Sequence, residues 1–252
     1  MRMDLNSDVG ESYGIYTLGD DEALMAYITS ANIACGFHGG DPQVMQRTVQ
    51  MAKAHGVGIG AHPGYPDLAG FGRRVVKLSE NEIESMVLYQ IGALAAFVRA
   101  QGAVLRHVKP HGALYNHAAK DMPTARAIAR AVERFDSSLI LVGLANSFLI
   151  DAAREFGLAF AREGFIDRAY ASDGTLVPRT EAGAVLPSPA RAVQVAMQLV
   201  REGTVRTIEG TLVPLELDTF CIHGDTPGAV QIAAAVSEAL RAEGVELKAM
   251  LA

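Results

Sequence analysis

Several short apolar stretches of this sequence carry a polar or ionisable residue at every second position. The first has Asp4, Asn6 and Asp8, and a later one has Lys109 and His111. Side chains two positions apart on a β-strand lie on the same face. Burial of so many charges would cost several kcal/mol each, against a total stability of roughly 5–15 kcal/mol. The pattern therefore predicts strands whose polar faces together form a reaction site.

These stretches alternate regularly with helical patterns. Strands are expected at 2–8, 30–35, 58–63, 105–111, 139–144, 159–164 and 219–223. Helices are expected after them at 20–29, 42–55, 79–101, 121–134, 147–156, 188–202 and 228–243. The helix at 79–101 is the clearest, because Ser79 and Glu82 form a capping-box pattern and Gly102 follows its end. Seven β–α units predict a parallel sheet, and no linker divides them, so we expect one domain over residues 1–252.

A closed barrel is favoured over an open sheet. The central strands of an open doubly wound sheet are apolar on both faces, and here only 139–144 has that character. The other strands suit a seven- or eight-stranded barrel, in which active sites lie at the carboxyl ends of the strands. Two segments interrupt the alternation: a long connection at 165–187 that could form a lid, and a β-hairpin at 203–218.

Composition narrows the classes of function. The net charge is −6 and no basic cluster has interleaved aromatics, which argues against nucleic-acid binding. No apolar run reaches the roughly 18 residues of a membrane span. A strand pattern begins within the first residues and leaves no room for a signal peptide. Two cysteines form neither a disulfide framework nor a thiolate zinc site, so we expect a cytoplasmic protein. No nucleotide-binding motif of a known short kind is present.

Four histidines fall at the ends of four different strands. They are His38, His62, His111 and His223, and each is followed by Gly or Pro. Small residues after a strand let the backbone turn sharply and bring a ligand close. Four equivalent positions favour a catalytic site over four separate structural roles. His107 lies lower in its strand and is expected to support the site through a hydrogen bond, whereas His55 and His117 are expected on the surface.

Acidic residues accompany these histidines. Asp8 and Glu11 end the first strand and Glu163 ends the sixth, where carboxylates can orient imidazoles, accept protons or bind a divalent ion. Asp41 and Asp225 follow histidines, but each also precedes a helix, where aspartate is a common N-cap. Both interpretations stay open for these two residues.

Cations and deeper polar residues complete the expected site. Lys109 faces the same way as His111, and its expected duty is to support developing negative charge. Asp4, deeper in the barrel, is expected to be a structural partner of Lys109 or His107. Arg168 and Arg179, in the long connection, could hold a carboxylate or phosphate, or be solvated loop residues. The expected substrate-binding residues are Asn6, Glu11, Asp41, Lys109, Arg168 and Arg179.

A divalent metal is one further hypothesis. Asp8, His62 and His111 would form a two-histidine, one-carboxylate set from three strand ends. No local ligand motif such as His-Glu-x-x-His is present, so this rests on topology alone. Cys221 could instead act as a nucleophile, although a small buried residue is the favoured interpretation.

The ordered motifs of the chain resemble one family. They are Asp4–Glu11, Asn32–Asp41, Gly60–Pro63, Val108–Tyr115, Glu163–Tyr170 and Cys221–Asp225. They resemble the LamB/YcsF family, which forms the A subunit of prokaryotic 5-oxoprolinase. The resemblance implies a TIM-like (β/α)7 barrel of the glycoside hydrolase/deacetylase type, acting in the ATP-dependent opening of 5-oxoproline to L-glutamate. It also implies the B and C subunits as partners that use the ATP.

For this reaction, a hypothesis about the mechanism gives each residue type a role. The partners would phosphorylate the lactam carbonyl, and this chain would open the ring. Asp8 with His111 or His62 would act as base, His38 or His223 as acid, and Lys109 with Arg168 or Arg179 would hold anionic groups. The expected catalytic residues are Asp8, His38, His62, His111, Glu163 and His223.

Two rival hypotheses stay open. One is a stand-alone metal-dependent hydrolase or deacetylase acting on a carbohydrate or amide without ATP. The other is a non-catalytic component that only binds the substrate. The sequence does not distinguish a monomer from a homo-oligomer.

Overall fold

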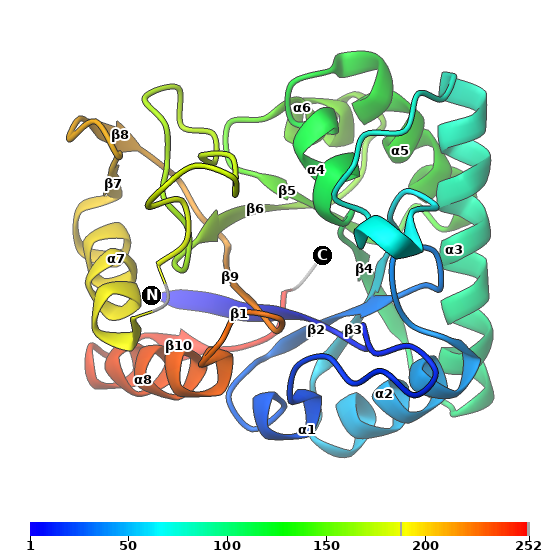
Figure 1. Ribbon diagram of the computed structural model, residues 1–252, viewed down its shortest axis with the longest axis horizontal. Coiled ribbons are helices and arrows are strands. Elements are labelled where there is room, and N and C mark those ends of the chain that lie inside the picture. The colour runs from blue at the N-terminus through cyan, green and yellow to red at the C-terminus, as the bar shows by residue number, and fades with distance from the viewer. Residues whose placement is uncertain (187, 251–252) are drawn as a thin grey trace.

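The computed structural model describes residues 1–186 and 188–250. In this part of the chain seven parallel strands close into a barrel that helices surround (Figure 1). Around the ring the strands are β1 (Arg2–Val9), β2 (Ser30–Ala34), β3 (Gly58–His62), β4 (Leu105–Val108), β5 (Ile140–Leu144), β6 (Phe160–Phe165) and β9 (Thr219–His223). β9 pairs with β1 from Asp4–Thr219 to Asp8–His223, which closes the ring. The predicted seven-stranded TIM-like barrel is confirmed.

Most helices lie where the sequence places them: α2 (Pro42–Ala54), α3 (Glu80–Ala100), α5 (Met122–Phe135), α6 (Phe148–Glu155), α7 (Pro189–Glu202) and α8 (Ala229–Ala242). The expected helix at 20–29 is wrong in length, since α1 spans only Asp21–Leu24. The amide of Thr29 already donates to Leu5 O at 2.7 Å, which draws the chain into β2. A short 3₁₀ turn, η1 (Leu68–Gly70), lies between β3 and α3.

Three further elements lie outside this regular alternation. We did not expect α4 (Gly112–Ala118), which begins directly at the turn after β4 and has no capping side chain. β7 (Thr204–Arg206) and β8 (Leu212–Pro214) form the expected hairpin. β10 (Glu246–Leu247) pairs beside the start of β1. The expected long connection leads from β6 to α7, and its last residue, 187, lies outside the described residues.

α3 is long and apolar enough, by length and composition alone, to cross a membrane. Core helices of globular proteins meet the same measure. In this chain its residues Ile83, Val87, Ile91 and Leu94 are buried in the hydrophobic core, and the helix packs against α5. The capping box at its start is present, with Ser79 N donating to Glu82 Oε2 at 2.7 Å. α3 is therefore accounted for as a core helix.

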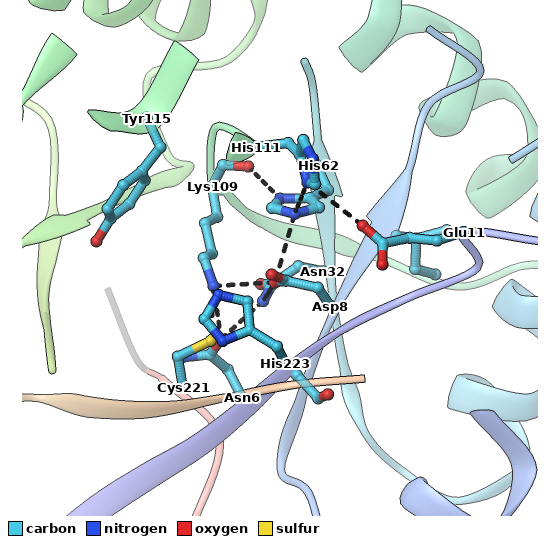
Figure 2. A network of polar contacts seen from close by, with 12 residues as sticks. Asn6, Asp8, Glu11, Asn32, His62, Lys109, His111, Tyr115, Cys221 and His223 are labelled. Atoms are coloured by element: carbon cyan, nitrogen blue, oxygen red, sulfur yellow. Dashed lines mark hydrogen bonds and ion pairs between the residues drawn. The ribbon is translucent and has the colours of Figure 1, made fainter. Parts of the chain in front are cut away.

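The two faces of β1 differ in chemistry although both are buried. Leu5 and Val9 belong to the hydrophobic core outside the barrel wall. Asn6 and Asp8 point into the barrel, where their side chains bond to residues of other strands (Figure 2). The alternation seen in the sequence therefore separates an apolar layer under the helices from a polar interior.

Asp4 forms the deepest polar layer of that interior. Its carboxylate accepts hydrogen bonds from Thr29 Oγ1 and Ser30 Oγ, each at 2.6 Å, and from Thr219 Oγ1. The expected partnership with Lys109 or His107 is therefore wrong, because neighbouring hydroxyl groups satisfy the carboxylate first. Burial without a cation raises the pKa of Asp4 to about 6.

This raised pKa predicts a pH-dependent contribution to stability. Between pH 3.8 and about 6 folded Asp4 holds a proton that the unfolded chain has lost, so stability falls as pH rises through this window. Asp4→Asn resembles the protonated form, so its unfolding free energy should not fall in this window. Relative to the wild type, the unfolding free energy of Asp4→Asn should rise by roughly 3 kcal/mol from pH 4 to pH 7. Urea unfolding across this range measures the difference, with the exposed Glu133→Gln as control. A constant difference at all pH values would contradict the prediction.

Candidate active site

The ammonium of Lys109 lies in the barrel interior, just after β4 (Figure 2). Its Nζ is 2.9 Å from Asp8 Oδ1 and 2.8 Å from Glu163 Oε1. It also lies 3.0 Å from Cys221 Sγ and 3.3 Å from Asn6 Oδ1. An ammonium has three N–H donors, so these four acceptors occupy all of them. Lys109 therefore links β1, β6 and β9, and its donors are already used by protein groups.

Mutual attraction keeps this centre ionised. Burial opposes the charged form of Lys109, but the carboxylates of Asp8 and Glu163 outweigh it and raise the pKa of Lys109 well above its usual value. Burial also opposes ionisation of Asp8, whereas His62 and Lys109 hold the pKa of Asp8 well below its usual value. At neutral pH Asp8 is therefore a carboxylate and Lys109 an ammonium.

Amide side chains connect this centre to its surroundings. Asn32 Nδ2 donates to Asn6 Oδ1 at 2.7 Å and to Asp8 Oδ1 at 2.8 Å. His107 Nε2 lies 2.8 Å from Asn32 Oδ1 and must donate, because an amide oxygen only accepts. The supporting hydrogen bond expected of His107 is confirmed. A Cβ on Gly60 would lie 2.0 Å from the same Nε2, so only glycine leaves room for this ring.

Glu163 is fully buried beneath the cavity. Its Oε1 accepts from Asn6 Nδ2 at 3.0 Å as well as from Lys109, and its Oε2 accepts from Tyr115 Oη at 2.7 Å. Both carboxylate oxygens are thus engaged by protein donors. This placement favours a supporting role for Glu163 and Asn6, which we had expected to be a catalytic and a substrate-binding residue.

His62 and His111 face each other above Lys109. His62 Nδ1 lies 2.7 Å from Lys109 O, and His111 Nε2 lies 2.8 Å from Phe71 O. Both nitrogens must donate, because a carbonyl only accepts. In its neutral form each ring then has a lone pair on its other nitrogen, His62 Nε2 or His111 Nδ1, and these two atoms are 3.1 Å apart. Glu11 Oε1 lies 3.3 Å from the same His111 Nδ1. Three acceptors converge without a hydrogen between them, so a cation or an extra proton would stabilise the group.

His38 lies beside this group. Its Nε2 is 3.2 Å from Glu11 Oε1 and its ring stacks on His111, with 3.6 Å between centroids. Its Nδ1 is buried and has no hydrogen-bond partner among the described residues. Burial and the nearby His111 lower the pKa of His38 to about 3, so the ring is neutral. Burial opposes ionisation of Glu11, but the adjacent His111 and His38 outweigh it and hold the pKa of Glu11 below its usual range.

Ligand atoms of Glu11, His38, His62 and His111 lie within 4.8 Å of one another. Imidazole nitrogens with one carboxylate are a donor set typical of zinc and related ions. The expected set contained Asp8, which the structure groups instead with Cys221 and His223. Asp8 Oδ1 is still only 3.4 Å from His62 Nε2, so Asp8 borders the four-residue cluster.

A cavity of about 890 Å³ opens above these side chains. Asp8, His62, Lys109, His111 and His223 line its inner part, whereas other lining residues come from α4 and from the connection after β6. The structure therefore brings together Asp8 and three of the four strand-end histidines at one cavity. His38 and Glu11 do not line the cavity; they lie behind His111.

Arg168 lines the same cavity although it is only 4% exposed. Its guanidinium donates to the carbonyls of Ala184 at 3.1 Å and Val177 at 2.6 Å. No carboxylate of the described residues lies within ion-pair distance of Arg168. Burial and the nearby Arg179 lower the pKa of Arg168 to about 10, so it remains charged at neutral pH. A buried cation held only by carbonyls is suited to an anionic ligand.

The other expected residues have structural partners. Asp41 is the N-cap of α2, where its Oδ1 accepts from Gln43 N at 2.8 Å. Asp225 does not cap α8, whose N-cap is Gly228; it pairs with Arg73. The N-cap interpretation is thus confirmed for Asp41 and wrong for Asp225.

Two histidines were expected on the surface. His55 is exposed at the end of α2, as expected. His117 is half-buried in α4, lies 3.0 Å from Tyr65 Oη and lines the cavity, because the unexpected α4 turns it inward. The expectation for His117 is therefore wrong.

Sequence reasoning missed Asn32, Tyr115 and Asp167 as individual site residues. Asp167 is fully buried, and its two oxygens lie 3.1 and 2.9 Å from His223 Nδ1. All three residues lie inside motifs noted in the sequence. Their place inside these motifs was the available signal, but their partners are distant in the sequence.

Comparison of the sequence with known proteins identifies the family of this chain. Residues 3–252 match the profile of the LamB/YcsF family. The chain belongs to the LamB/YcsF family. A relative from Pyrococcus furiosus, named as the A subunit of 5-oxoprolinase, is 53% identical, with 99% of this chain and 98% of that protein covered. Another of the same name, from Symbiobacterium thermophilum, is 56% identical over 98% of this chain and 95% of its own length.

A similar barrel is also found among solved structures. The lactam utilization protein from Thermus thermophilus superimposes with a TM-score of 0.94 at 50% sequence identity. The match covers 99% of this chain and 100% of that one. The similarity therefore extends over the barrel and its connections.

Removal of the central cation should destabilise the barrel. Lys109→Met leaves the buried Asp8 and Glu163 without their shared partner, so the unfolding free energy at pH 7 should fall by about 3–5 kcal/mol. The loss should shrink at pH 4, where the carboxylates of the variant can take up protons. Urea unfolding at both pH values measures this, with Lys248→Met, in an exposed ion pair, as control. A loss below about 1 kcal/mol at pH 7 would contradict the role of Lys109.

Proposed function

We propose that this chain is the A subunit of an ATP-dependent 5-oxoprolinase, which opens the lactam ring of 5-oxo-L-proline to give L-glutamate. The observation that carries the proposal is its full-length similarity, at 53–56% identity, to relatives of that name. The cavity fits this chemistry, because it combines a carboxylate, imidazoles with free lone pairs and buried cations. These groups can activate water, donate a proton and hold an anion.

The partners of this chain are the B and C subunits, which carry out the ATP chemistry. The absence of short nucleotide-binding motifs from the sequence supports this division. A five-membered lactam is a poor electrophile, and phosphorylation of its oxygen by the partners makes the ring carbon reactive. A cytoplasmic location fits the two free, buried cysteines, Cys35 and Cys221.

Asp8 is the residue best placed to accept a proton from the attacking water. Its Oδ1 already accepts from Lys109 and Asn32, whereas no bond from a described residue engages its Oδ2. When no metal ion is bound, His62 Nε2, with its lone pair 3.4 Å from Asp8 Oδ1, can share the proton. The base is therefore the Asp8–His62 pair, next to the cavity.

His223 is the better candidate for the acid. His38 is fully buried and does not line the cavity, whereas His223 does. Water adds to the activated ring carbon, the C–N bond breaks, and the departing nitrogen takes a proton from His223. A second water then hydrolyses the acyl phosphate to a carboxylate and inorganic phosphate, so atoms and charge balance.

Anionic groups of the substrate bind at Arg168 and Arg179. The donors of Lys109 are already occupied by Asp8, Glu163 and the Cys221 thiol. Arg168 lacks a carboxylate partner among the described residues, and Arg179 lines the cavity beside it. The two arginines therefore replace Lys109 as the expected holders of the lactam carboxylate or its phosphoryl group.

A divalent metal ion fits the cluster of Glu11, His38, His62 and His111. Asp8, Glu11, Glu163 and Lys109 together bring excess negative charge, and the lone pairs of His62 and His111 converge. His38 Nε2, 3.2 Å from Glu11 Oε1, brings a further nitrogen to the cluster. When bound, such an ion supplies Lewis acidity. A stand-alone metal-dependent hydrolase is the second candidate function, and this same cluster favours it.

Reconstitution tests the proposed function. This chain with its B and C partners should release glutamate and phosphate from 5-oxoproline and ATP, and omission of any of the three should abolish release. Asp8→Asn should lower the rate by about 10²–10⁴-fold through loss of the base, whereas the exposed His55→Gln should not. Normal glutamate release with Asp8→Asn would remove the assigned base. Turnover of amides or acetylated sugars by the chain alone, without ATP, would favour the rival hydrolase.

Metal binding can be measured without turnover. Titration of the metal-free chain with Zn²⁺ should show a bound ion and a rise in Tm, because the ion binds the folded state. Glu11→Gln should weaken binding by at least about tenfold, since the site loses its carboxylate ligand, and His55→Gln should not. Unchanged affinity in Glu11→Gln would place the ion elsewhere. If Zn²⁺, Mn²⁺ and Co²⁺ all fail to bind, the converging lone pairs and negative charge of the cluster are stabilised by protons and not by a metal ion.

A further inference from the structure

His223 differs from the other histidines around the barrel interior. The rings of His62 and His111 each have one nitrogen on a carbonyl and the other in the cluster, and His107 is bound to Asn32. The outer nitrogen of His223, Nε2, is not engaged by any group of residues 1–186 and 188–250. His223 lines the cavity, and Figure 2 shows its ring beside Lys109 and Asp8. This nitrogen is therefore available to a substrate.

The inner nitrogen of His223 is held by one carboxylate. Its Nδ1 lies 3.1 and 2.9 Å from the two oxygens of Asp167. The backbone N of His223 and Thr226 Oγ1 also donate to Asp167, at 3.2 and 3.3 Å. Every partner of Asp167 is thus a donor, as an ionised carboxylate requires. Phe165 stacks on the ring at 5.3 Å between centroids and restricts its rotation.

A purely structural explanation accounts poorly for Asp167. A fully buried carboxylate is costly, and a neutral side chain could accept the hydrogen bonds from the backbone and Thr226. The next residue, Arg168, does not neutralise it, since that guanidinium is bound to the carbonyls of Ala184 and Val177. Within the described part of the chain, the only ion pair of Asp167 is with His223.

We propose that Asp167 is a positioning residue that fixes His223 as the Nδ1–H tautomer and aims its Nε2 at the substrate. The neutral ring then has its lone pair on Nε2, which takes up a proton from solvent in the cavity before the reaction and gives this proton to the departing ring nitrogen. The carboxylate also stabilises the imidazolium that exists between these two steps. The part of the proposal that concerns proton donation rests on the proposed function, whereas the tautomer does not.

Asp167→Asn tests this role in the reconstituted complex. An asparagine keeps the shape, but its NH₂ group can donate to Nδ1 and so favour the wrong tautomer. We expect kcat to fall by roughly 10²–10⁴-fold, with KM for 5-oxoproline changed less than about threefold. Asp173→Asn, an exposed aspartate in the same connection, is the matched control and should keep the wild-type kcat. A wild-type kcat in folded Asp167→Asn, or a loss confined to KM, would overturn the proposal.

A measurement on the wild-type chain covers the case in which Asp167→Asn does not fold. ¹H–¹⁵N NMR of the histidine rings, with His223 assigned by the signal lost in His223→Gln, reports which nitrogen carries the hydrogen. We expect Nδ1–H, with a strongly downfield proton, and an unprotonated Nε2 in the neutral ring. An Nε2–H tautomer would overturn the proposal. If the reconstituted complex makes no glutamate while Nδ1–H is observed, the proposed function fails and the positioning by Asp167 stands.

Discussion

The attraction between the Lys109 ammonium and two carboxylates is the interaction on which the barrel interior depends. Asp8 and Glu163 come from strands far apart in the sequence, and each would be costly to bury alone. One cation between them keeps both near the axis without mutual repulsion. The amides of Asn6 and Asn32 then fix their orientation. The reactive groups above can adopt a defined geometry because this layer is already satisfied.

The share of polar side-chain atoms that have a hydrogen-bond partner within the protein decreases from the bottom of the barrel to the top. Asp4, at the bottom, has hydroxyl donors on both oxygens. In the Lys109 layer the ammonium and both oxygens of Glu163 have partners, but Oδ2 of Asp8 has none among the described residues. Above it, the lone pairs of His62 and His111 converge without a donor between them. The outer nitrogen of His223 faces the cavity. Chemical reactivity therefore lies where the protein stops supplying its own partners.

Much of the fold was predictable from the sequence because alternation is a local property. Polar residues at every second position, such as Asn6 and Asp8, revealed which faces of the strands turn inward. The ends of parallel strands meet at one rim, so strand-end histidines such as His62 and His111 could be expected to gather. α4 escaped notice because it follows directly from a strand-end turn without a capping side chain.

The roles within the site were less predictable because they depend on partners distant in the sequence. Lys109 was expected to support developing negative charge, because no sequence pattern reveals its contacts with Glu163 and Cys221. Glu11 and Asp8 look equivalent in sequence, yet only Glu11 lies in the four-residue cluster with His62. The tautomers of His62 and His111 depend on backbone carbonyls, whose positions no sequence pattern reveals.

The strand that closes the barrel is also the last of the ring to leave the ribosome. β9 pairs with β1, and the hydrogen bond from Asn6 Nδ2 to Thr219 Oγ1 joins residues 213 positions apart. Contacts of such long range form only after loop-closure entropy has been overcome. A nascent chain that ends before β9 lacks both Cys221 and His223, and its Asp8 faces an open edge. Closure of the barrel and completion of the cavity lining are therefore one event.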